Sequence, residues 1–205
     1  MKRHLTRLAA LLIGALMLSP ATAEAGCSRT AVSGAEARLP AGRINQSLLD
    51  AAILSEVNYE RCRKGLSALK PEPRLTKTAA GHSKWMARAA KLSHRGSNTL
   101  SQRLKRSGVK FRTGAENIAM MHYYQIDRVV FLTKGTCQFT NQAGRALPPH
   151  SYASLARAAV GYWMNSSKHR DNILNRRAKF MGSGAGFDGR AQYCGTVYLT
   201  QNFIG

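Results

Sequence analysis

The most distinctive ionisable group in the sequence is Glu116. Between Pro73 and Ile126 the chain carries 11 Lys or Arg residues and a single acid, and that acid is Glu116. A lone carboxylate in so basic a segment is expected to pair with a specific cation or to hold a specific site. Its small and apolar neighbours, such as Ala115 and Ile118, are a poor setting for an idle surface charge. Glu116 is therefore the first candidate functional residue.

Two histidines could share a site with this carboxylate. His94 follows one predicted helix and His169 follows another. Two neutral imidazoles can bind a divalent metal, most naturally zinc. A nearby carboxylate could ligate the metal, orient an imidazole or act as a general base, so Glu116 is a candidate base. The separations of 22 and 53 residues are not a metal-ligand spacing. Spacing alone favours the alternative in which each histidine satisfies local backbone.

Other routes to chemistry have weaker support. No serine is flanked as a hydrolase nucleophile would be. The stretch Gly184–Gly189 matches the dinucleotide-binding fingerprint literally, but a strand is expected to follow it instead of the required helix. His82, His122 and His150 are expected near the surface.

The N-terminus has the pattern of an export signal. Lys2, Arg3 and Arg7 precede an apolar run, and small residues suited to cleavage follow before Gly26. This pattern predicts a signal peptide at residues 1–25, followed by a flexible arm at 26–46. The mature protein is expected to be secreted or periplasmic and to have no transmembrane segment.

The net charge indicates an anionic partner. The chain has a formal charge of +21 at pH 7. For an exported protein, this charge favours anionic envelope or membrane-surface material, or lipid, as the partner. Nucleic acid is not expected as a partner, and a monomer is predicted. The alternative is that the charge serves only solubility.

The four cysteines predict two disulfide bonds. An even count in an oxidising compartment favours pairing, and no C-x-x-C motif points to a metal ribbon or a redox site. Four cysteines allow three pairings, and sequence alone does not choose between them. We favour Cys27 with Cys62 and Cys137 with Cys194.

The elements that would position these residues are helices first and strands late. Apolar spacing predicts helices at 47–64, 76–92, 100–107 and 153–164, the first starting with a capping box at Ser47. The segment 109–121 is strand-like, 122–150 is ambiguous, and two strands end the chain. This order predicts an α+β sandwich within one domain at 47–205.

Several segments together resemble a known family. They are Asn58–Arg61, Gly65–Leu69, Gly114–Ala119, Trp163–Ser166, His169–Leu174 and Gln201–Phe203. The chain resembles the CAP superfamily of cysteine-rich secretory, antigen 5 and pathogenesis-related-1 proteins, in its bacterial, YkwD-like branch. The resemblance implies an α-β-α sandwich with a central antiparallel sheet and a large cleft. It also implies that residues 122–150 are a lineage-specific insertion.

The resemblance also assigns roles to residues. His94, Glu116 and His169 match three members of a cleft tetrad of two histidines and two acids. Ser166 stands where the second acid is expected, and Asn117 lies beside Glu116 in the same cleft. One carboxylate instead of two puts an acid–base pair mechanism in doubt.

Three functions follow as hypotheses. We favour an exported binding protein whose cleft holds a divalent metal or a lipid or envelope ligand, with zinc as the possible cofactor. The first alternative is a zinc-dependent hydrolase that uses Glu116 as its base. The second is a non-catalytic structural interaction module. The sequence favours a protein that is not an enzyme.

Overall fold

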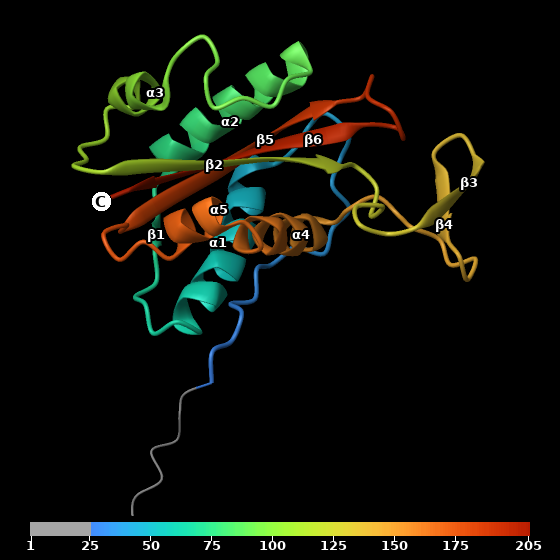
Figure 1. Cartoon of the computed structure of the whole chain (residues 1–205), viewed down its shortest axis with the longest axis horizontal. Helices are drawn as coiled ribbons and strands as arrows, with labels where there is room; N and C mark the ends of the chain where they lie inside the picture. Colours follow the sequence, from blue (N-terminus) through green and yellow to red (C-terminus); the bar gives the residue numbers. More distant parts are fainter. Residues whose placement is uncertain (1–25) are drawn as a thin grey trace, which may run out of the picture.

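The centre of the molecule is a four-stranded sheet with the strand order β1-β5-β6-β2 (Figure 1). The computed structural model describes residues 26–205, so the signal peptide predicted at 1–25 lies outside the described residues. The strands are β1 Lys70–Pro71, β2 Gly114–His122, β5 Phe180–Asp188 and β6 Thr196–Ile204. The short β1 runs parallel to β5, and the other neighbours are antiparallel.

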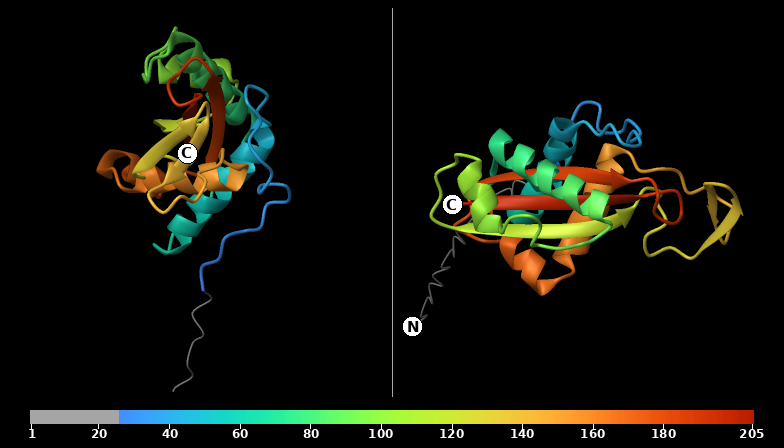
Figure 2. Two further views of the ribbon diagram at one scale, coloured as in Figure 1. Left: turned by 90° about the vertical axis from the view of Figure 1, so that its right-hand side faces the viewer. Right: turned by 90° about the horizontal axis from the view of Figure 1, so that it is seen from above.

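Within residues 26–205, five helices cover the two faces of this sheet. They are α1 Gln46–Cys62, α2 Pro73–Ala89, α3 Leu100–Arg106, α4 Tyr152–Met164 and α5 Ser167–Ile173. In the views of Figures 1 and 2, α2 and α3 lie on one face, whereas α1, α4 and α5 lie on the other. The predicted α-β-α sandwich is therefore confirmed. The largest apolar cluster lies between the sheet and the layer of α1 and α4.

Glycines in β5 allow α2 to lie directly on the sheet. Gly182, Gly184 and Gly186 alternate along the strand, so they face the same side. A Cβ atom at any of them would collide with the backbone of α2. The glycine repeat at 182–186 is therefore a close-approach surface for a helix, and the expected strand, β6, follows it.

Two helix starts differ from the sequence prediction. The first helix is capped by the Asn45 side chain, which accepts from the Leu48 amide, so Ser47 is not its cap. The second helix begins at Pro73, because Glu72 caps it and proline needs no amide partner in the first turn. The predicted start at Thr76 was late for this reason.

Residues 122–150 form an excursion at one end of the sheet. Within it, β3 Phe131–Gly135 and β4 Gln138–Asn141 make a hairpin that projects from the sandwich (Figure 2). The disulfide from Cys137 to Cys194 fastens the hairpin to the loop before β6. That this segment is a lineage-specific insertion stays a prediction.

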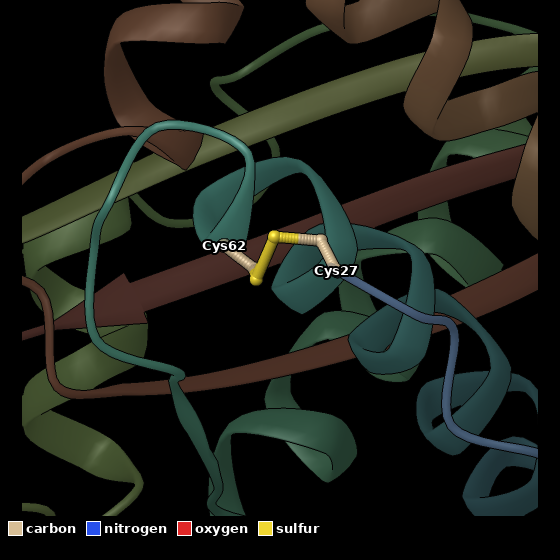
Figure 3. The surroundings of a disulfide bond; sticks show 2 residues. All are labelled: Cys27 and Cys62. Carbon is tan, nitrogen blue, oxygen red and sulfur yellow. A yellow bond between two sulfur atoms is a disulfide. The ribbon is translucent and has the colours of Figure 1, made fainter. Parts of the chain in front are cut away.

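The N-terminal segment does not form the flexible arm that the sequence predicted at 26–46. Leu39 is fully buried and belongs to the main core. Cys27 forms a disulfide with Cys62 at the end of α1 (Figure 3). Residues 26–45 thus run along the domain surface with one end covalently fixed, and both favoured cysteine pairings are confirmed.

Candidate functional site

Glu116 lies on β2 with only 2% of its side chain exposed. One carboxylate oxygen, Oε1, is 3.1 Å from Nδ1 of His94. The other, Oε2, accepts a hydrogen bond from the guanidinium of Arg103 on α3. The expectation that this lone acid has a specific cationic partner is therefore met, and both oxygens are occupied. We refer to His94, Glu116 and His169 as the histidine site.

Arg103 is the residue of this region that sequence reasoning did not single out. It lies on α3, whose start is fixed by a capping box between Thr99 and Gln102. Besides Glu116, its guanidinium donates to the backbone carbonyls of His94 and Asn98. One side chain thus fastens the loop between α2 and α3 to β2. The only sequence signal was the lone acid itself, which could have paired with any of 11 cations.

His94 presents one ring nitrogen to Glu116 and exposes much of its ring. Its side chain is 58% exposed. A carboxylate only accepts hydrogen bonds, so Nδ1 of His94 carries the hydrogen in this contact. In the neutral imidazole, Nε2 then keeps its lone pair. This arrangement leaves Nε2 free to bind a metal or a hydrogen-bond donor.

His169 lies on α5, on the other side of β2 from α3 (Figure 1). Its Nδ1 atom is buried and has no hydrogen-bond partner among the residues at 26–205. Partial burial lowers the pKa of His169 below its usual range, and the nearby His94 lowers it further. The neutral imidazole, which is the form that binds metals, is therefore favoured here.

Asn117, which is expected in the cleft beside Glu116, makes structural hydrogen bonds beneath His169. Neighbouring residues of a strand point to opposite faces, so Asn117 faces α5 whereas Glu116 faces α3. Asn117 is fully buried, and its Nδ2 donates to the His169 carbonyl at 3.1 Å and to Oε1 of Gln201 at 3.2 Å. Its Oδ1 accepts from Asn172 at 2.8 Å. These contacts hold α5 against the sheet.

Ser166, at the position where the resemblance implies a second acid, immediately precedes α5. It is the N-cap residue of that helix, but its hydroxyl makes no capping hydrogen bond. Its backbone carbonyl accepts from the Arg170 amide at 2.8 Å. Within residues 26–205, no hydrogen bond joins Ser166 to His94, Glu116 or His169.

A metal at this site would have at most two imidazole ligands, from His94 and His169, within residues 26–205. No group of three or more His, Cys, Asp or Glu side chains within residues 26–205 is arranged to hold a metal ion. Glu116 is already paired on both oxygens, so it is placed to orient His94 and not to ligate. The free Nε2 of His94 and the imidazole of His169, whose ring nitrogens make no hydrogen bond within residues 26–205, are the donors that remain.

The three other histidines considered above are arranged differently from one another. His82 and His150 are buried, each only 4% exposed, so the prediction of surface positions was wrong for both. His82 stacks on Trp85, and its Nε2 is 2.9 Å from the Ser93 carbonyl. Burial lowers the pKa of His150 to about 4. His122 is partly exposed and contacts Asp127 at 2.7 Å.

Solved structures with the same fold include two bacterial surface or extracellular proteins. The chain is 27% identical, with a TM-score of 0.53, to an extracellular protein from Bacillus anthracis that contains an SCP domain. The match covers 76% of this chain and 40% of that protein, so this chain spans less than half of that relative. An outer surface protein from Borrelia burgdorferi has a TM-score of 0.54 at 16% identity, covering 80% of this chain and 98% of that one.

Two sequence comparisons, with curated proteins and with models of protein families, show which family the chain belongs to. No curated protein matches the chain. Among the helices of residues 26–205, none is both long and apolar enough to cross a membrane. The model of the cysteine-rich secretory protein family, CAP, matches residues 54–203, which include the whole histidine site and its supporting amides. The chain therefore belongs to the CAP family of cysteine-rich secretory proteins.

Proposed function

We propose that the protein is an exported binding protein whose histidine site holds a divalent cation through His94 and His169, with zinc as the first candidate. The observation that carries this proposal is the contact between Nδ1 of His94 and Glu116 at 3.1 Å. Carboxylates orient metal-binding imidazoles in this way, leaving the second ring nitrogen for the ion. The lowered pKa of His169 supports the same assignment.

The proposal gives Glu116 a supporting role. A general base needs an oxygen that can reach a substrate or a water molecule. Both oxygens of Glu116 are occupied, and its side chain is 2% exposed. The hydrolase alternative would require Arg103 or His94 to leave the carboxylate. For this reason we favour binding over hydrolysis.

The basic surface supplies the second part of the proposal. With a charge of +21 and a fold shared with extracellular and surface proteins, the protein is suited to dock on anionic envelope or membrane-surface material. Such docking would hold the histidine site close to the envelope.

Zinc titration calorimetry tests the metal part. We expect the wild type to take up zinc at neutral pH, and His94→Ala and His169→Ala each to abolish the binding while the fold persists. Glu116→Gln should weaken binding about 10–100-fold, because it removes the orienting carboxylate. His122→Ala is the matched control, since it removes a histidine that contacts a carboxylate outside the site.

Two results would refute the metal assignment. One is no zinc uptake by the folded wild type at neutral pH. The other is binding that His122→Ala reduces as much as His94→Ala does. Melting temperatures of all variants, measured without zinc, separate loss of binding from loss of fold.

A further inference from the structure

A cavity whose lining includes none of His94, Glu116 and His169 lies between α2, α3 and the loop that joins them. Its volume is about 500 Å³. Both helices lie on the same face of the sheet (Figure 2). Its lining includes five basic side chains and no acidic one. The basic residues are Arg74, Lys77, Arg88, Arg103 and Arg106.

Most of this positive charge is uncompensated. Arg74 pairs with Glu72, and Arg103 pairs with Glu116. The three other cations of the lining, Lys77, Arg88 and Arg106, are exposed and form no ion pair within residues 26–205. Like charges around one cavity repel each other, so a bound anion would relieve this repulsion.

An unpartnered donor gives an independent indication of a ligand. The side chain of Arg103 is only 10% exposed, and its Nε atom is buried without a hydrogen-bond partner. Buried guanidinium donors in proteins normally have a partner. No solvent reaches the Nε atom in this arrangement, so an anion in the adjoining cavity would supply a partner once the Arg103 side chain shifts toward it. The same guanidinium holds Glu116, so this residue links the cavity to the histidine site.

The cavity also has an aromatic wall. Trp85 lines it, half-buried, and its indole lies parallel to the ring of His82 with centroids 5.7 Å apart. Ser97 and Asn98 add polar groups on the loop side. A ligand with a charged group and a small carbon framework, such as a headgroup, would use both the cations and the indole.

We propose that this cavity binds a phosphate-bearing group that carries two or more negative charges. A single carboxylate would neutralise only one of the free cations, whereas a phosphate monoester or diphosphate offers several oxygens to Arg and Lys donors. The proposal deepens the docking part of the proposed function, on which it rests, by naming the site and its chemistry. It does not depend on metal binding.

The test measures binding of two probes: inorganic pyrophosphate, and phosphatidylcholine vesicles with and without phosphatidate. Lys77→Gln/Arg106→Gln removes two cavity cations. Lys134→Gln/Arg145→Gln removes two exposed cations from the β3–β4 region and is the charge-matched control. We expect the cavity variant to bind at least about tenfold more weakly, because two charge-assisted contacts are lost. The control should stay within about twofold of the wild type.

Each outcome decides the proposal. Cavity-dependent binding of pyrophosphate alone identifies a soluble phosphate ligand, whereas cavity-dependent binding to phosphatidate vesicles identifies a lipid headgroup; both support the site. Equal weakening in the two double variants would mean that net charge alone acts, and would overturn the site while leaving docking intact. If neither probe binds the wild type, both the cavity site and the proposed docking on anionic material are overturned, whereas the metal proposal is unaffected. A change in Trp85 fluorescence that disappears in Trp85→Phe would place the ligand in the cavity.

Discussion

The two sides of the histidine site are held in place very differently. On the α5 side, buried amides fix the backbone of His169, with Asn117 fully buried between Gln201 and Asn172. On the α2–α3 side, His94 lies in a loop with 58% of its side chain exposed. That loop is fastened by Arg103, which donates to the His94 and Asn98 carbonyls, and by His82, whose Nε2 is 2.9 Å from the Ser93 carbonyl.

This difference indicates which part of the site can adapt to a ligand. Buried and fully paired amides allow only one arrangement, because any shift leaves polar groups unpaired. A half-exposed ring in a loop can move at little cost. We therefore infer that the position of His169 is fixed, whereas the ring of His94 can move. The Arg103–Glu116 ion pair connects the loop of His94 to the sheet.

Replacing Arg103 should have the largest effect on stability. In Arg103→Met, the carboxylate of Glu116 stays buried without its cation, which costs about 3 kcal/mol or more of the free energy of unfolding. Denaturant unfolding measures this cost. Arg63→Met is the control, because Arg63 pairs with Glu60 at the surface and its loss should cost about 1 kcal/mol or less.

A double variant sharpens the Arg103 result. If the cost arises from an unpaired buried charge, Arg103→Met/Glu116→Met should recover at least about half of the lost stability. An Arg103→Met variant as stable as Arg63→Met would show that the loop is not held by this pair.

Replacing Asn117 should have the next largest effect. Asn117→Ala leaves the His169 carbonyl and the side chains of Gln201 and Asn172 without a buried partner, so we expect a loss of about 2–3 kcal/mol. Asn165→Ala, which removes an exposed amide contact to the Gly161 carbonyl, is the matched control. Equal unfolding free energies for the two variants would contradict a rigid α5 side.

The sequence indicated the main members of the site but not how they are held. Glu116 was conspicuous because it is the sole acid among many cations, yet local sequence could not select its partner. Arg103 pairs with it because the capped start of α3 and the path of the connecting loop place that guanidinium over β2. Such a contact depends on tertiary geometry, which residue spacing does not contain.

The outline of the fold could be predicted from the sequence, whereas details that depend on tertiary contacts could not. Several short motifs in the right order indicated the sandwich, and a strand was expected directly after the glycines of β5, where β6 lies. The start of α2 was misplaced because Pro73 looks like a loop residue until Glu72 is seen to cap the helix. His150 was wrongly expected at the surface. It is buried because residues 122–150 fold back onto the domain, and local sequence does not show that path.

The pKa of His169 tests whether its ring is held partly buried on the α5 side, and its effect on stability should be smaller than that of the two substitutions above. Because burial, and then His94, lower its pKa, its NMR titration midpoint should lie below the ordinary value of 6.5. Between the lowered pKa of folded His169 and 6.5, the unfolded chain binds more protons than the folded one. The contribution of His169 to the free energy of unfolding should therefore rise with pH up to 6.5.

The same titration separates the two causes. In His94→Gln the midpoint should move upward yet stay below 6.5, because burial is the larger cause. A wild-type midpoint at or above 6.5 would mean that the His169 ring is solvated. It would contradict the partial burial of that ring against the sheet.

Replacing His94 should have the smallest effect on stability. His94→Ala removes a hydrogen bond to a buried carboxylate oxygen, and an unpaired oxygen of this kind normally costs about 1–3 kcal/mol. Here the ring is 58% exposed, so its removal lets water reach Oε1 of Glu116 and replace the lost donor. We therefore expect a loss of about 1 kcal/mol or less in denaturant unfolding. A loss as large as that of Asn117→Ala would mean that His94 is as rigidly integrated as His169. A small loss would leave the folded variant suitable for measuring what His94 contributes to binding.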